Sequence, residues 1–184
     1  MTESISQSPA PKKKKAAARK AAKAAFDPRI VVFACNWCSY TGADTAGVSR
    51  IQHQPHFRMI RVMCSGRIQP AFVLRAFEKG ADGVLVSGCH FGDCHYIFGN
   101  ERAVEQFEKT MNVVKLLGIE EGRLRLEWIS AAEGARFAEV IDEFTDQVRS
   151  LGPSPFATSD AIDEIEVPET ETETGTETGK EMEA

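Results

Sequence analysis

Five cysteines are the residues of this sequence whose type and spacing best suit chemistry. They comprise a C-x-x-C pair, a single thiol and a second pair with four residues between, namely Cys35, Cys38, Cys64, Cys89 and Cys94. Thiolates bind soft metals and metal clusters, and paired thiols can cycle between dithiol and disulfide. No secretory signal precedes them, so the sequence favours a reducing compartment and, by default, the cytoplasm. No other group of residues forms a convincing catalytic constellation.

The elements that must position these thiols alternate between two hydrophobic periods. Short apolar or alternating runs predict strands at 29–34, 57–63, 83–87 and 123–129, and longer periods predict helices at 44–52, 70–79 and 100–117 and a last helix carrying Phe137 to Val148. Ser130 and Glu133 fit a capping box before that last helix. This alternation predicts one α/β domain of the flavodoxin or Rossmann type, with a four-stranded, mainly parallel sheet covered on both faces.

Three of the cysteines follow predicted strands directly. Cys35, Cys64 and Cys89 come after the first, second and third strands, and Cys38 and Cys94 lie in the loops that follow. In open parallel sheets the carboxyl ends of the strands share one edge, and ligands gather there. Buried structural cysteines would instead be expected inside strands or helices. The sequence therefore predicts that all five thiols meet in one crevice.

Three kinds of site remain open for such a cluster of thiols. An iron–sulfur cluster needs four thiolates, often with C-x-x-C spacing. Structural zinc uses Cys/His sets, to which His90 and His95 could contribute. A dithiol switch would use Cys35 and Cys38 but leave three cysteines without a role.

The neighbouring residues favour the iron–sulfur cluster. Gly66 and Gly88 permit a close backbone approach, and their N–H groups can donate to sulfur. Arg67 can offset part of the negative charge of a thiolate-ligated cluster. We expect His90 and His95 to shape their loop through hydrogen bonds, and Tyr96 and Phe98 to pack that loop down.

Charge divides the chain into three parts. Residues 1–27 form a basic head, since the first 25 residues hold seven bases and one acid, and residues 156–184 form an acidic tail with ten acids and one base. Both lack the apolar residues that would offset the entropy of ordering, so we expect disorder there and one domain at 28–155. The head is interpreted as a solubility element rather than a nucleic-acid arm, and no apolar run is long enough for a membrane span.

Several segments resemble one known family, the delta subunits of methyl-viologen-reducing hydrogenases. They are CNWCSYTGAD at 35–44, RVMCSGR at 61–67, GADGVLVSGCHFGDCHY at 80–96, GN at 99–100 and WISAAEG at 128–134. The G-C-H-x-G-D-C-H-Y string is highly specific, whereas C-x-x-C alone is not. The resemblance spans nearly all of residues 29–153 and excludes both charged tails.

The resemblance implies a cofactor and partners. Such subunits bind one [2Fe-2S] cluster and relay electrons from a hydrogenase, or in some relatives a formate dehydrogenase, to a heterodisulfide-reductase A-type flavoprotein. All five family cysteines match, and because one cluster needs four ligands, one thiol is spare. We therefore expect a non-catalytic electron-transfer subunit that docks through residues such as Trp37, Tyr40, Arg67 and Phe91. A zinc-stabilised interaction module and a thiol–disulfide oxidoreductase are the alternatives.

Overall fold

The computed structural model describes residues 26–157, so the predictions for the basic head and the acidic tail fall almost wholly outside the described residues. The elements are β1 (Ile30–Cys35), α2 (Ser39–Val48), β2 (Phe57–Val62), η1 (Ser65–Arg67), α3 (Pro70–Glu78), β3 (Gly83–Gly88), α4 (Gly99–Leu116), η2 (Glu121–Arg123), β4 (Leu124–Trp128) and α5 (Gly134–Leu151). None of the described helices is long and apolar enough to span a bilayer.

Helix α2 differs most from its predicted boundaries. It begins at Ser39, directly after the C-x-x-C pair, rather than at residue 44. Its buried residues are Ser39, Gly42 and Ala46, which are small and give no apolar stripe. The hydrophobic period therefore carried no signal for the first turn of this helix.

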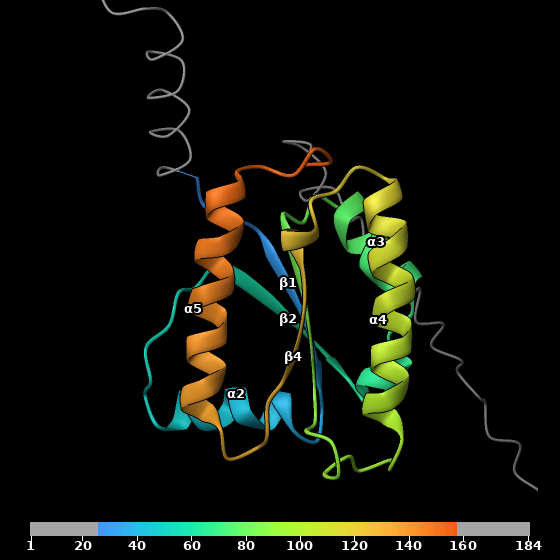
Figure 1. Cartoon of the computed structure of the whole chain (residues 1–184). Helices are drawn as coiled ribbons and strands as arrows, with labels where there is room; N and C mark the ends of the chain where they lie inside the picture. Colours follow the sequence, from blue (N-terminus) through green and yellow to red (C-terminus); the bar gives the residue numbers. More distant parts are fainter. Residues whose placement is uncertain (1–25, 158–184) are drawn as a thin grey trace, which may run out of the picture.

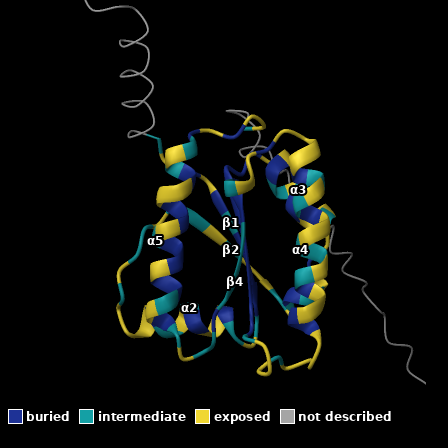
Figure 2. Cartoon of the chain, in the orientation of Figure 1, coloured by how far each residue is buried: buried dark blue, intermediate teal, exposed yellow. Residues whose placement is uncertain are grey.

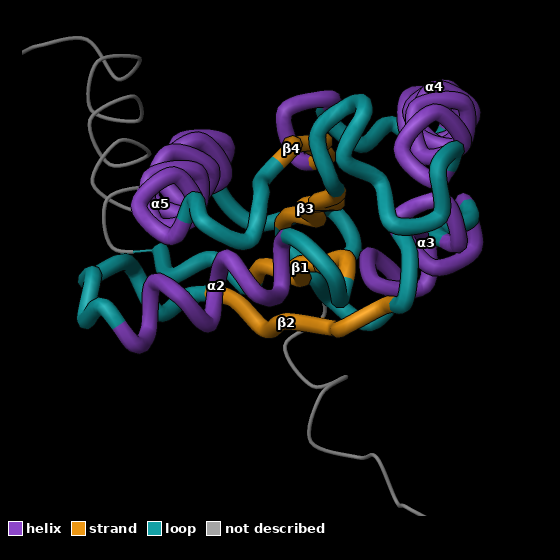
Figure 3. The backbone as a smooth tube through the Cα atoms, turned by 90° about the horizontal axis from the view of Figure 1, so that it is seen from below, coloured by secondary structure: helices purple, strands orange, loops and turns teal. Residues whose placement is uncertain are grey.

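The sheet is fully parallel and has the strand order β2-β1-β3-β4 (Figures 1 and 3). The chain passes from β1 to one side to form β2 and then crosses to the other side to form β3. This is the flavodoxin-like order, in which the switch point lies between β1 and β3. The predicted fold class is confirmed, with the first and third strands at the centre of the sheet.

Two helical layers cover the sheet, with α2 and α5 on one face and α3 and α4 on the other (Figure 3). The alternating side chains of β1 divide between the two cores: Val32 packs with Phe137 and Phe144 of α5, and Phe33 packs with Val73 and Phe77 of α3. Figure 2 shows these buried stripes facing the sheet. The strand order is therefore held by apolar burial on both faces.

The two ends of the described chain lie together at the amino ends of the strands, at the top of Figure 1. The Asp82 carboxylate accepts hydrogen bonds from the N–H groups of Arg29 (2.9 Å) and Ser154 (2.8 Å). The loops that carry the cysteines lie at the opposite end, at the bottom of the same view. Both charged tails thus leave the domain far from the thiols.

Arg123 is fully buried and fastens this end of the fold. Its guanidinium donates to the carbonyl oxygens of Asp82 (3.1 Å), Gly152 (2.8 Å) and Pro153 (3.1 Å). An Arg123→Met variant would leave buried acceptors unpaired, each costing about 1–3 kcal/mol, so we expect a loss of about 3 kcal/mol in the free energy of unfolding. Thermal unfolding would measure it. The exposed Arg136→Met is the control and should cost less than about 1 kcal/mol; equal losses for the two variants would contradict the prediction.

Candidate metal centre

The three strand ends deliver thiols to one edge of the sheet, as predicted. Cys35 is the last residue of β1, Cys64 follows β2 by two residues, and Cys89 directly follows β3. Cys38 precedes α2, and Cys94 lies in the loop that leads to α4. One detail differs from the expectation that no cysteine lies within an element, because Cys35 still pairs with Val62 in the ladder. We call this edge, with its five cysteines, the cysteine rim.

The sulfur atoms of the rim contact one another in sequence. Cys35 Sγ lies 3.7 Å from Cys89 Sγ, and both residues are only 1% exposed. Cys89 also hydrogen-bonds with Cys38, and Cys64 with Cys94. All five are free thiols and none is in a disulfide. The structure therefore brings together every thiol that the sequence placed at this edge.

The protonation equilibria of these thiols are strongly perturbed. The hydrogen bond from Cys89 lowers the pKa of Cys35 to about 6, assisted by the backbone N–H groups of Trp37, Cys38 and Ser65. The same hydrogen bond raises the pKa of Cys89. Burial raises the pKa of Cys38 and of Cys64. The Cys35 sulfur is thus arranged as a thiolate, which is the form that binds metal.

Gly99, the first residue of α4, touches two of the thiols. A Cβ built on it would overlap Cys64 Sγ and would lie 3.0 Å from Cys94 Sγ. Both contacts are closer than a non-bonded carbon–sulfur pair allows, so only glycine fits beneath these two thiols. Sequence reasoning assigned no role to this residue, although Gly99-Asn100 is part of the family resemblance.

The three residues predicted to assist a cofactor have different surroundings. A Cβ on Gly66 would lie 2.5 Å from the Gly99 carbonyl oxygen, and one on Gly88 would lie 2.6 Å from Ser65 Oγ. Both glycines therefore let the cysteine loops pack against each other. Arg67 is exposed at the end of η1. Their roles toward a cofactor stay predictions.

Buried polar groups fix the loop that begins at Cys89. Asn100 Nδ2 donates to the carbonyl oxygens of His90 (2.9 Å) and, at 3.4 Å, of Cys89. On the other side of the strand end, Ser87 Oγ donates to Ser39 Oγ (2.8 Å), which donates to the Gly88 carbonyl (3.2 Å). These bonds satisfy the backbone where β3 ends, and they hold Cys89 in place.

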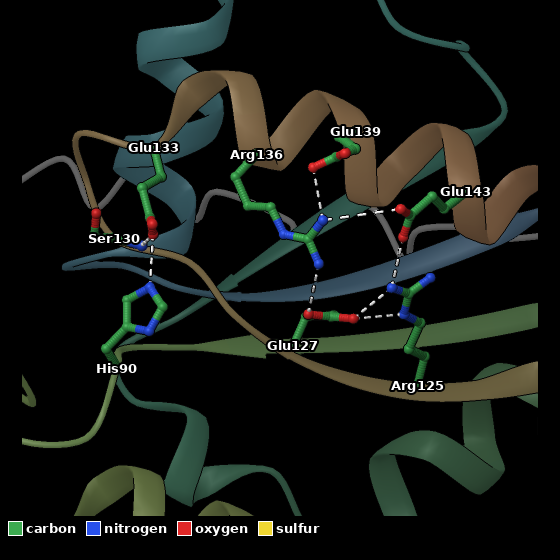
Figure 4. Close-up of polar contacts among 8 residues, drawn as sticks. All are labelled: His90, Arg125, Glu127, Ser130, Glu133, Arg136, Glu139 and Glu143. Atoms are coloured by element: carbon green, nitrogen blue, oxygen red, sulfur yellow. Dashed lines mark hydrogen bonds and ion pairs between the residues drawn. The ribbon is translucent and has the colours of Figure 1, made fainter.

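His90 forms an ion pair with Glu133, as Figure 4 shows. Its Nε2 atom lies 2.6 Å from a Glu133 oxygen that also accepts the Ser130 N–H at 2.7 Å. His95 stacks on the Trp37 ring with a centroid distance of 3.8 Å. Both histidines therefore shape the loop, as predicted. The predicted capping box is present as its Glu133 half only, and the helix begins at Gly134.

The Ser130–Glu133 turn is anchored by the neighbouring ion pairs of β4 and α5 (Figure 4). Arg125 donates to Glu127 (2.7 Å) and Glu143 (2.8 Å), and Arg136 pairs with Glu139 (2.7 Å) and Glu127 (3.5 Å). These half-exposed pairs are individually weak, but together they fasten the strand to the helix on either side of the turn. The turn is thus held next to the Cys89 loop.

Removing the Glu133 charge should loosen this link in a pH-dependent way. The Ser130 N–H and then His90 hold the pKa of Glu133 below its usual range, so its carboxylate stabilises the fold above about pH 4.3, and this stabilisation is lost as the pH falls through the lowered pKa. We therefore expect Glu133→Gln to lower Tm at pH 7, and the difference from wild type to shrink in acid. Thermal melts across pH, with Glu139→Gln as control, test this; a difference that is constant with pH would contradict it.

Seven large apolar side chains border the cysteine rim and are exposed: Trp37, Tyr40, Met63, Phe91, Tyr96, Ile97 and Phe98. We call this set the apolar border. The expectation that Tyr96 and Phe98 pack the loop down is wrong, since both are about half exposed, although Tyr96 makes edge contacts with Trp37 and His95. An exposed apolar cluster of this kind marks an interaction surface.

The donor set restricts which inorganic group the rim can hold. Soft thiolates suit zinc, copper(I) and iron–sulfur clusters. Within residues 26–157, no three Cys, His, Asp or Glu side chains are grouped closely enough to hold a single metal ion. The thiols are instead distributed as Cys35, Cys38 and Cys89 on one side and Cys64 and Cys94 on the other. This distribution fits a group with more than one metal atom.

Comparison with known proteins identifies the sequence pattern. The pattern described as "Methyl-viologen-reducing hydrogenase, delta subunit" matches residues 30–152. The iron-sulfur subunit of an F420-non-reducing hydrogenase (vhc) of Methanococcus voltae is 51% identical over 70% of this chain and 89% of its own length. The iron-sulfur subunit of the F420-non-reducing hydrogenase of Archaeoglobus profundus is 50% identical over 71% of this chain and 96% of its own length.

A third relative has a different organisation. It belongs to the ferredoxin/F420H2-dependent CoB-CoM heterodisulfide reductase of Methanosarcina acetivorans, in which it is the A-type component. It is 51% identical over 68% of this chain, but the match covers only 16% of that protein. The domain described above thus has a counterpart within a much longer chain.

Proposed function

The chain belongs to the methyl-viologen-reducing hydrogenase delta subunit family, and on that premise we propose that it transfers electrons through one [2Fe-2S] cluster at the cysteine rim. The observation that carries the proposal is the meeting of five free thiols from three adjacent strand ends. Four of them would be ligands, and Gly66, Gly88 and Arg67 would support the cluster by close approach and charge. A cluster of this kind exchanges one electron at a time.

The residues around the rim support electron transfer rather than bond-making. Backbone N–H groups already point at the Cys35 sulfur, and such donors raise the reduction potential of a cluster. The buried Cys35 and Cys89 lie behind the partly exposed Cys38, Cys64 and Cys94. A cluster gripped there would lie close to the surface, next to the apolar border, where a partner can dock.

The proposed partners are a hydrogenase or formate dehydrogenase as donor and a heterodisulfide-reductase A-type flavoprotein as acceptor, all acting in the cytoplasm. The relative that forms part of a heterodisulfide reductase chain supports the second partner, because covalent linkage keeps two redox modules adjacent. The names of the two hydrogenase iron-sulfur relatives support the first. We propose no role in nucleic-acid binding.

Metal analysis of anaerobically purified protein tests the proposal. We expect two irons and two sulfides per chain, visible absorption, and an electron paramagnetic resonance signal on reduction that integrates to one spin. Stoichiometric zinc in a colourless protein would instead support the interaction module. Insulin reduction by the metal-free protein at thioredoxin-like rates would support the dithiol oxidoreductase.

Docking can be separated from cluster binding with two variants of one helix. Phe98 precedes α4, is 58% exposed and belongs to the apolar border, whereas Leu116 ends the same helix and is 86% exposed. We expect Phe98→Ala to slow electron transfer to the flavoprotein roughly tenfold, with an unchanged cluster spectrum, because apolar anchors dominate interfaces. Stopped-flow reduction measures it. Leu116→Ala is the control, and equal rates for the two variants would count against the docking surface.

A further inference from the structure

The largest groove of the described chain lies at the end opposite to the cysteine rim. It has a volume of about 850 Å³ and lies between the first residues of β1 and β2 and the second half of α3. Val31 and Phe33 of β1 are paired in register with Arg58 and Ile60 of β2, so all four side chains face the α3 side. Ile60 is nevertheless 46% exposed, because α3 does not reach the edge strand.

The walls of this groove are both apolar and positively charged. Ile60 and Phe72 supply exposed apolar surface, and Arg29, Arg58 and Lys79 supply cations. No carboxylate of residues 26–157 lies within ion-pair distance of these three cations. We call this surface the basic groove; its remaining charged walls are Arg75, which pairs with Glu78, and Asp27, which lies 3.7 Å from His56.

The acidic part of the sequence begins close to this groove. The Asp82 carboxylate joins the N–H of Arg29, a wall of the groove, to the N–H of Ser154. The first acid of the tail, Asp160, is only six residues beyond Ser154. From there the sequence carries ten acids and one base up to Glu183, with Ile162, Ile165 and Val167 placed among the first acids.

We propose that the basic groove binds residues 160–183 of the same chain. The carboxylates would face Arg29, Arg58 and Lys79, and Ile162, Ile165 and Val167 would cover Ile60 and Phe72. The short distance from Ser154 to the groove keeps the effective concentration of the segment high. The basic head also leaves the domain nearby, but its charge has the same sign as that of the groove.

The bound segment would also protect the edge of the sheet. β2 is an edge strand with Arg58, Ile60 and Arg61 exposed, and uncovered edges invite pairing with other chains. Because the groove and the cysteine rim lie at opposite ends of the strands, the segment can remain bound while a redox partner docks at the apolar border. The inference therefore stands independently of the cluster.

Carbodiimide cross-linking of the full chain, read by mass spectrometry, tests the proposal. The reagent joins a lysine amine to a nearby carboxylate with loss of water, so we expect links from Lys79 to acids of 160–183 at least fivefold above those from Lys109, an exposed lysine of α4. The excess should disappear in 1 M salt, where the Debye length is about 3 Å. An equal yield at Lys109, or links found only between isotopically distinct molecules in a mixture, would overturn the proposal.

Amide hydrogen exchange of the full chain provides a second readout. In a variant with all ten tail acids changed to Asn or Gln, we expect exchange within residues 57–62 to be roughly fivefold faster than in the wild type, and Arg58→Glu should give much of the same effect. The same peptide should exchange normally in Lys109→Glu. Unchanged exchange in the tail variant would overturn the proposal.

Discussion

Gly99→Ala is expected to abolish iron binding while leaving the fold intact. The added methyl group would overlap Cys64 Sγ and lie 3.0 Å from Cys94 Sγ, so both thiols would have to turn away from the rim. Because Gly99 starts α4 and its neighbour Asn100 holds the Cys89 loop, the helix cannot retreat without loss of those bonds. We expect the iron content to fall by about tenfold or more, as a loss of ligands implies.

A matched glycine makes this expectation specific. Gly47 lies in α2, next to the same group of loops in sequence, but a Cβ built on it meets no atom within 4 Å. Gly47→Ala should keep full iron content and gain about 0.5–1 kcal/mol in stability, since alanine is the better helix residue. Iron analysis and thermal unfolding of both variants check this. Full iron content in Gly99→Ala would show that Cys64 and Cys94 are not both needed.

The sheet and the placement of the thiols could be predicted from sequence because they depend on short-range patterns. Runs such as Ile30–Ala34 and Gly83–Ser87 are apolar and bounded by turns, which is sufficient to identify buried parallel strands. Once the strands are identified, topology alone brings Cys35, Cys64 and Cys89 to one edge. The structure confirms this step with a Cys35–Cys89 sulfur distance of 3.7 Å.

Features that depend on contacts between distant segments were missed. The small residues Ser39, Gly42 and Ala46 begin α2 without an apolar stripe, because Gly42 packs against the backbone of Ser130. The role of Gly99 depends on sulfurs 35 and 5 residues before it in sequence, Cys64 and Cys94, which no local pattern reports. The exposure of Tyr96 and Phe98 was also misjudged, because aromatic residues in a loop are ordinarily packed down.

These misses concern the part of the molecule that a partner must recognise. Helix α2, the Cys89–Phe98 loop and the start of α4 together border the rim, and their positions are set by tertiary contacts rather than by propensity. The apolar border is costly to expose unless something covers it. Its presence beside the thiols therefore favours a protein that works within a complex over an isolated dithiol oxidoreductase.

Replacing the cysteines one at a time is expected to give four colourless variants and one that keeps the [2Fe-2S] signal. Cys89→Ala should be among the colourless ones, because Cys89 hydrogen-bonds with both Cys35 and Cys38 and lies at the centre of the thiol group. Alanine is preferred to serine at Cys35 and Cys89, since both sites are buried and a hydroxyl there would lack the surroundings it needs. Serine suits the partly exposed Cys38, Cys64 and Cys94.

The pattern of retention distinguishes the three kinds of site. A two-iron cluster tolerates the loss of only the one thiol that is not a ligand, so Cys38→Ser with full colour beside a colourless Cys35→Ala would identify Cys38 as spare. A dithiol oxidoreductase would keep insulin reduction in Cys89→Ala, because that reaction needs only Cys35 and Cys38. Iron, sulfide and zinc are measured on each variant together with thermal unfolding. Retention of the cluster in two or more single variants would contradict four-thiolate ligation, because five cysteines leave only one to spare.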